Sequence, residues 1–123
     1  MLFSLLLSIM SLAMSITSKT NKSIKDLIKV RNCAYVMMTQ DGKIGRRFLF
    51  RKGKFSSDKN LTDYDLAFIF KSADVGFKTL ALGGKTGIAE AINNWDLKLA
   101  GNIDISNFFQ IMIGVSMGIM KRN

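Results

Sequence analysis

The chain has 123 residues, which suits one domain of ordinary size, and its 18 Lys and Arg against 9 Asp and Glu give a formal net charge of +9. This positive charge favours an anionic partner, either a membrane surface or a nucleic acid. The chain has no His, one Cys (Cys33) and one Glu (Glu90), which argues against the usual general base, most metal sites and any internal disulfide. We therefore expect no enzymatic activity, no cofactor and no metal, and we interpret Cys33 as a small buried apolar residue.

The first 30 residues are apolar at the start and basic at the end, and the first charged side chain is Lys19. Polar residues recur every three or four positions, the spacing of one stripe along a helix. They are Ser4, Ser8, Ser11, Ser15, Ser18, Lys22, Lys25 and Lys29. We therefore expect one helix over residues 2–30 with a narrow polar edge, packed on the domain or on a membrane.

Three roles are open for this helix: a cleaved secretory signal, an uncleaved membrane anchor, or a helix that covers a sheet. Its uncharged run would rise about 27 Å, at the short end of what a bilayer core requires. No basic residue precedes the run and Ala13-Met14-Ser15 is a poor cleavage site, which argues against a signal. The residues expected at the surface of an anionic membrane are Lys19, Lys22, Lys25 and Lys29. We expect a cytoplasmic protein peripheral to a membrane, with an uncleaved anchor as the alternative.

Residues 33–70 predict four short strands joined by turns. Asp41-Gly42 indicates a hairpin turn between residues 33–38 and 45–52, and Lys52-Gly53-Lys54 indicates the next turn. In the fourth strand, residues 64–70, alternation places Leu66, Phe68 and Phe70 on one face. We expect these four strands to form an antiparallel meander.

Basic and aromatic residues are interleaved in the second and third of these strands. They are Arg46, Arg47, Phe48, Phe50, Arg51, Lys52, Lys54 and Phe55. On an exposed sheet this mixture can bind single-stranded nucleic acid by stacking and charge. On a half-buried strand, alternation instead sends the Phe side chains inward and the basic side chains outward. We favour the second interpretation, in which the basic face contacts anionic headgroups, and we do not expect nucleic acid as a partner.

After Phe70 the pattern changes to short helices. Asp74 is expected to cap one that ends at Gly83-Gly84, and a second runs from Thr86 or Gly87 to about Asn94. Residues 95–100 alternate again and predict a fifth strand. A final helix over about residues 104–120 is apolar nearly all round, and its two glycines, Gly114 and Gly118, allow a helix, a lipid chain or a sheet edge to approach closely.

The order of these elements and several local sequences resemble the sterol carrier protein 2 (SCP2-like) family of lipid-binding domains, over about residues 35–119. The stretches that carry the resemblance are residues 48–54, 64–70, 74–83 and, most specifically, 89–102. The resemblance implies an α+β domain over residues 31–123, with a five-stranded, mostly antiparallel sheet, helices covering one face, and an apolar tunnel between them. It implies non-catalytic binding and carriage or presentation of a fatty acyl, sterol-like or polyprenyl chain, and it allows a lipid-using enzyme complex as a further partner.

The tunnel is expected to be lined by large apolar side chains that share the inward faces of their elements. These lipid-binding residues are Leu66, Phe68, Phe70, Phe77, Leu80, Trp95, Leu97, Leu99, Phe108, Phe109 and Met112. The alternative from another class is a membrane-anchored structural or interaction protein whose core is filled.

Overall fold

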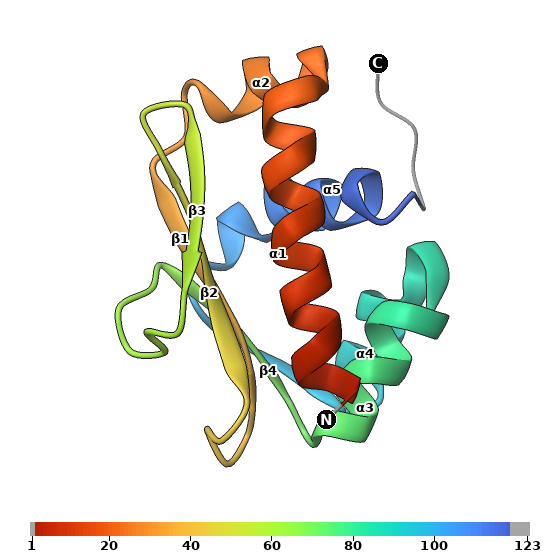
Figure 1. Ribbon diagram of the computed structural model, residues 1–123. Helices are drawn as coiled ribbons and strands as arrows, with labels where there is room; N and C mark the ends of the chain where they lie inside the picture. The colour runs from red at the N-terminus through yellow and green to blue at the C-terminus, as the bar shows by residue number, and fades with distance from the viewer. Residues whose placement is uncertain (1, 119–123) are drawn as a thin grey trace.

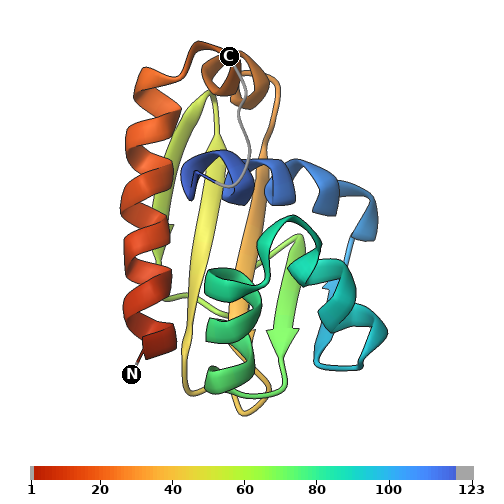
Figure 2. The ribbon, with the colours of Figure 1, turned by 90° about the vertical axis from the view of Figure 1, so that its right-hand side faces the viewer.

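The computed structural model describes residues 2–118, with only the backbone of Lys85, as an α+β domain of two layers (Figure 1). One layer is a five-stranded sheet with the strand order β3-β2-β1-β4-β5. The strands are β1 (Cys33–Thr39), β2 (Gly45–Arg51), β3 (Lys54–Asp58), β4 (Leu66–Phe70) and β5 (Leu97–Gly101). The helices form the other layer and all lie on the same face of the sheet (Figures 1 and 2).

Three of the strand pairings are antiparallel, and the pairing of β1 with β4 is parallel. The expectation of a mostly antiparallel sheet is therefore confirmed, but the four-stranded meander is wrong. The two hairpin turns are as expected, with positive φ angles at Gly42 (73°) and Gly53 (76°). After β3 the chain crosses to the other side of β1, where β4 takes an interior position in the sheet and β3 is left at an edge. This order suits the two strands, because β4 is apolar on both faces and β3 is polar.

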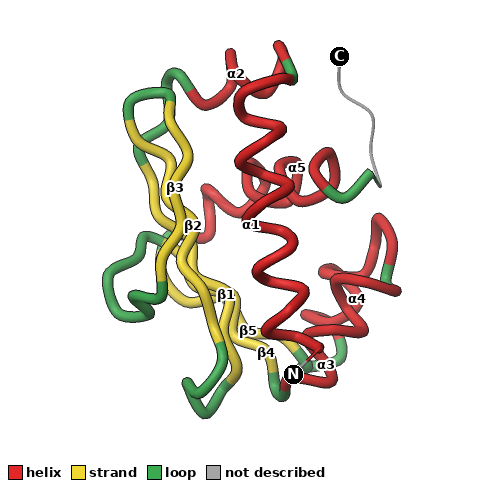
Figure 3. The backbone as a smooth tube through the Cα atoms, in the orientation of Figure 1, coloured by secondary structure: helices red, strands yellow, loops and turns green. Residues whose placement is uncertain are grey.

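The N-terminal segment forms two helices, α1 (Leu2–Thr20) and α2 (Lys22–Ile28). The expectation of one continuous helix is therefore wrong. Asn21 is extended (φ −88°, ψ 114°), and its side-chain oxygen accepts a hydrogen bond from the backbone N–H of Ile24 at 3.1 Å. Asn is among the preferred N-cap residues, so it begins a new helix here, and the change of direction is visible in Figure 3.

The C-terminal half supplies the other helices. They are α3 (Ala73–Phe77), which continues into a π-helical turn (Lys78–Leu82), α4 (Gly87–Asn93) and α5 (Ser106–Ser116). The cap of α3 is Ser72, which accepts from Val75 N–H at 3.2 Å, and not Asp74 as the sequence suggested. The helix α5 ends at Ser116, and the expected continuation to Met120 lies partly outside the described residues.

One hydrophobic core joins the N-terminal helices to the rest of the domain. The inner face of α1 buries Phe3, Leu6, Leu7, Met10 and Met14, and these belong to the same cluster as the inner face of the sheet and α5. Figure 2 shows α1 and α5 lying over the sheet. The residues 1–30 that we set apart in the sequence therefore pack as part of this domain, as far as the structure describes them.

Candidate functional site

The inner face of the sheet brings most of the predicted tunnel-lining side chains together. Phe68 lies opposite Leu99, and Phe70 lies opposite Leu97, so these side chains of β4 and β5 share a face. The buried members of one cluster are Leu66, Phe68, Phe70, Leu80, Leu97, Phe108, Phe109 and Met112, and Phe77 and Leu99 pack against it half-buried.

Trp95 does not join this cluster, because its side chain is 81% exposed. The strand β5 begins at Leu97, and Trp95 has a positive φ of 63° after α4. The N–H groups of Trp95 and Asp96 donate to the carbonyls of Ile92 and Ala91, at 3.2 and 2.9 Å. This is a Schellman-type helix end, in which the left-handed position is usually Gly. The sequence has Trp there, so the alternation of residues 95–100 was mistaken for a longer strand.

Aromatic side chains fill the centre of the layer between sheet and helices. Phe109 of α5 stacks on Tyr35 of β1 with ring centroids 4.3 Å apart, and it packs against Phe68 at 5.4 Å and Phe48 at 5.3 Å. The Tyr35 hydroxyl donates to the carbonyl of Ile105 at 2.8 Å, which satisfies its polar end inside the core. The sequence reasoning had left Tyr35 out of the site, although it alternates in phase with Met37 along β1.

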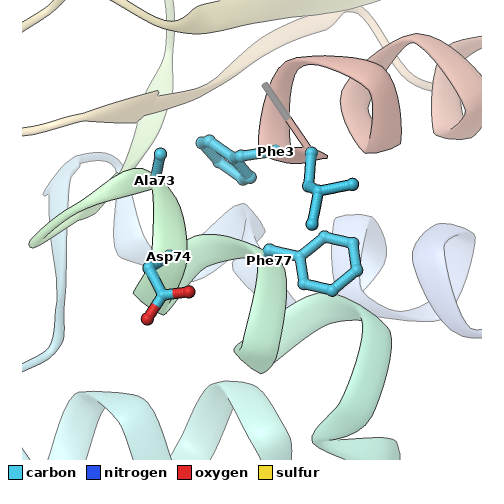
Figure 4. A pocket seen from close by; sticks show the side chains of 5 residues that line it. Phe3, Ala73, Asp74 and Phe77 are labelled. Carbon is cyan, nitrogen blue, oxygen red and sulfur yellow. The ribbon is translucent and has the colours of Figure 1, made fainter.

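A partly open pocket of about 220 Å³ lies where the first turn of α1 meets α3. It is lined by Leu2, Phe3, Ala73, Asp74 and Phe77, most of which Figure 4 shows as labelled side chains. The ring of Phe3 separates this pocket from the core, because it packs edge-on against Phe70 with centroids 5.5 Å apart. The approach of α3 is close enough that a Cβ on Gly76 would lie 2.6 Å from the Phe3 ring.

The volume of this pocket decides what it can hold without rearrangement. Ligand pockets usually enclose about 300–1,000 Å³, so the observed space is smaller than that of a typical lipid site. A long apolar chain therefore enters only if Phe3 and the first turns of α1 move away from α3.

The outward face of α1 carries a row of exposed apolar side chains. We call it the α1 stripe, and its exposed fractions are Leu2 61%, Leu5 58%, Ile9 48%, Leu12 64% and Ile16 55%. Steps of three and four residues place the stripe on one side of the helix. Lys19 follows in phase and is exposed, as are the other lysines of the expected membrane surface, Lys22, Lys25 and Lys29. Lys29 also pairs with Asp26 at 3.5 Å.

By length and composition α1 is the one helix among the described residues that can cross a membrane, with a mean hydropathy of 1.5 over its most apolar window. Core helices and signal sequences pass the same criterion. The inner side chains of α1 are packed on the sheet, with Met10 and Met14 fully buried.

The basic residues of β2 do not all point outward. Arg46 lies opposite Met37, on the same face as Phe48, so its side chain is on the inner face and our expectation for it is wrong. Arg47 is on the outer face, where its guanidinium binds both carboxylate oxygens of Asp58 at 2.9 and 2.6 Å. The hydrogen bond from Arg47, supported by smaller charge effects of Arg47 and Arg46, lowers the pKa of Asp58 below its ordinary value.

Two further side chains that could carry chemistry, Cys33 and Tyr35, are both buried. Cys33 is buried, and burial is the main reason why the pKa of its thiol is raised. Burial also raises the pKa of Tyr35 far above its ordinary value. Within residues 2–118, no three His, Cys, Asp or Glu side chains come together in a way that would hold a metal ion.

The architecture is the SCP2-like α+β fold: a five-stranded sheet with all its described helices on one apolar face. Among solved structures, the chain is similar to a UbiJ-SCP2 ubiquinone synthesis protein, with a TM-score of 0.62, 13% identity, and coverage of 83% of this chain and 90% of that chain. It is also similar to part of a double mutant of the sec-alkyl sulfatase PisA1, with a TM-score of 0.51, 15% identity, and coverage of 80% of this chain and 14% of that chain. No protein-family model and no curated protein matches the sequence. At these identities the likeness establishes the fold, and it confirms the expected α+β class with a five-stranded sheet. The apolar tunnel between sheet and helices stays a prediction.

Proposed function

We propose that this protein binds lipid without catalysis and carries or presents a fatty acyl, sterol-like or polyprenyl chain between its sheet and its helices. The observation that carries the proposal is the layer itself: an apolar sheet face covered by helices in an SCP2-like arrangement, with an apolar pocket open beside Phe3. The likeness to a ubiquinone synthesis protein supports a quinone-type chain as one member of this class. Binding of this kind requires no catalytic side chain.

Entry of the chain follows from the position of Phe3. The ligand enters between α1 and α3 at the pocket of Figure 4 and displaces the Phe3 ring, which gives access to Phe70 and the centre of the layer. The affinity comes from burying methylenes, at about 0.8 kcal/mol each before the ordering costs are subtracted. Because the core is already packed, the free energy needed to separate the helices offsets part of the free energy gained by burying the chain.

The α1 stripe supports docking on an anionic membrane as part of the same proposal. Its apolar side chains would lie in the interface while Lys19, Lys22 and Lys25 face the headgroups, at roughly 1 kcal/mol per Lys close to the surface. A cytoplasmic location peripheral to a membrane is part of the same proposal, with an uncleaved N-terminal anchor as its alternative. A lipid-using enzyme complex that receives the chain is a further partner within this proposal.

A second candidate is supported by the aromatic packing around Phe109. A core that is filled by Tyr35, Phe48 and Phe68 suits a membrane-anchored structural or interaction protein that binds no ligand inside. In that protein the inner face of α1 would complete the core and its exposed face would serve as the membrane contact.

A spin-labelled fatty acid, 16-doxylstearate, distinguishes the two candidates. Added to the full chain, it should broaden the methyl signals of Leu66, Leu80 and Leu97 in the apolar layer more strongly than those of Ile69 on the outer face of β4. Broadening confined to Leu5 and Leu12 of the α1 stripe would contradict internal binding and support the filled-core candidate.

A further inference from the structure

A groove of about 330 Å³ runs between α1 and the edge strand β3. Its walls are the serine edge of α1 on one side and the strands β2 and β3 on the other. The polar residues that matter here are Ser8, Ser11, Ser15, Arg46 and Ser57, and the apolar side chains of Leu12 and Phe55 complete the lining.

Among the described side chains that line this groove, Arg46 alone is charged, and it lies half-buried on the inner face of β2. Its guanidinium has five N–H donors, yet the one hydrogen bond it makes to a described residue goes to the Ser57 hydroxyl at 3.0 Å. No carboxylate within residues 2–118 forms an ion pair with it. Its charge helps to lower the pKa of Asp58, but that carboxylate is bound by Arg47 on the opposite face. Its charge therefore lacks a direct counterion in the part of the chain that is described.

The serine hydroxyls add neutral donors to this cation. Ser8, Ser11 and Ser15 lie on the edge of α1 that faces the groove, and their hydroxyls make no hydrogen bond to described residues. The middle of the serine stripe thus lies beside an inward-facing arginine, which the sequence pattern alone did not reveal. A guanidinium beside several hydroxyls matches the oxygen atoms of a phosphate or a carboxylate, which Arg can bind through two parallel hydrogen bonds.

We propose that this groove binds an anionic oxygen group, a phosphate or a carboxylate, with Arg46 as the charged ligand and the serine edge of α1 supplying hydroxyl donors. Phe55 leads from the groove to the core, since its ring packs against Phe50 at 5.2 Å and Phe48 at 6.3 Å. An amphiphile can therefore place its head at Arg46 and its chain along Phe55. In this lipid form the inference rests on the proposed lipid-binding function, whereas the anion site itself does not.

Three probes separate the sources of the anion: inorganic phosphate, dihexanoyl phosphatidic acid below its micelle concentration, and dihexanoylglycerol, which lacks the phosphate. Each is titrated into the full chain while backbone amide shifts of Ser8, Ser11, Arg46 and Ser57 are followed. We expect saturable shifts with at least one of the two phosphate-bearing probes. Binding of phosphatidic acid alone identifies a lipid head as the ligand, and binding of inorganic phosphate as well identifies the anion itself.

The variant Arg46→Gln should weaken this binding at least tenfold, because it removes charge-assisted hydrogen bonds to the anion. Arg51→Gln is the matched control, since Arg51 is an exposed base on the same strand, and it should leave the affinity within twofold. If Arg46→Gln does not fold, the double variant Ser8→Ala and Ser11→Ala replaces it, because Ala is the best helix former, and it should weaken binding at least threefold.

Equal weakening by Arg46→Gln and Arg51→Gln would overturn the inference, because it would show a general effect of charge. The absence of saturable shifts with both phosphate-bearing probes would overturn it as well. Binding of dihexanoylglycerol that is insensitive to Arg46→Gln, with no response to phosphate, would overturn the anion site and leave the proposed lipid-binding function standing.

Discussion

Phe3 and Leu2 are neighbours in α1 but differ sharply in burial, because successive helical residues point about 100° apart. This difference allows a sharp test of whether α1 belongs to the folded domain. Phe3 is 1% exposed and packs against Phe70, whereas Leu2 is 61% exposed. Truncation of a buried Phe to Ala costs about 3–5 kcal/mol of unfolding free energy. Substitution of an exposed residue away from such packing changes the unfolding free energy by about 0.5 kcal/mol or less.

We therefore expect Phe3→Ala to lower the unfolding free energy by about 3–5 kcal/mol and the melting temperature by roughly 10–20 °C. Leu2→Ala should leave both nearly unchanged. Equilibrium unfolding in urea, followed by far-UV circular dichroism, measures the difference directly. Equal small effects of the two substitutions would refute the packing of α1 on the sheet and would favour a helix that lies apart from the domain, as a membrane anchor does.

Three further predictions concern the ion pair, the thiol and the tryptophan. Asp58→Asn should lower stability at pH 7 by about 1 kcal/mol or less, because the pair with Arg47 is partly exposed. Folding lowers the pKa of Asp58, so this stabilisation is present above about pH 4 and is lost as the pH falls through the lowered pKa. The unfolding free energies of variant and wild type should therefore converge in acid. A difference that stays constant with pH would contradict the pairing. Cys33 should react with Ellman's reagent only slowly at pH 8 and quickly in urea, because the thiol is buried and its pKa is raised; fast reaction in the native state would contradict this. Trp95 should show the emission of a water-exposed indole, be quenched readily by acrylamide and respond little to a bound fatty acid, because it is 81% exposed; a blue-shifted, protected signal would instead place it in the apolar layer.

Binding to vesicles tests the α1 stripe by itself. Leu5→Asn combined with Leu12→Asn should weaken sedimentation with vesicles of phosphatidylglycerol and phosphatidylcholine, and high salt should weaken binding of the wild type, because screening shortens the reach of the lysine charges. The control is Ser4→Asn, an exposed polar position on another side of the same helix. Salt-insensitive association that persists in the double variant would contradict peripheral docking and favour a spanning anchor.

The fold class could be predicted from the sequence because its signals are local. Alternation in residues 66–70 gives the inner face of β4, and Asp41-Gly42 gives the first hairpin, both of which the structure bears out. The parallel pairing of β4 with β1 is a non-local choice, and its only trace in the sequence is that β4 is apolar on both faces while β3 is polar.

The errors came from single side chains that act against a pattern. Asn21 interrupts a continuous 3–4 spacing by capping a second helix, and Trp95 occupies a helix end where Gly is usual. Alternation was applied to the basic residues as a group, although its phase places Arg46 on the same face as Phe48 and Phe50. The sequence also did not predict the pocket between Phe3 and α3, because residue spacing does not reveal which helices pack together in the tertiary structure.

Native mass spectrometry of the full chain, purified without added lipid and then offered oleic acid, tests internal lipid binding most directly. The chain should retain an apolar adduct of defined mass or take up one oleic acid, and Phe3→Ala, which widens the entrance beside α3, should load at least as readily as Leu2→Ala. The outcome that contradicts lipid carriage is a chain of bare mass that takes up no oleic acid in the wild type or in either variant.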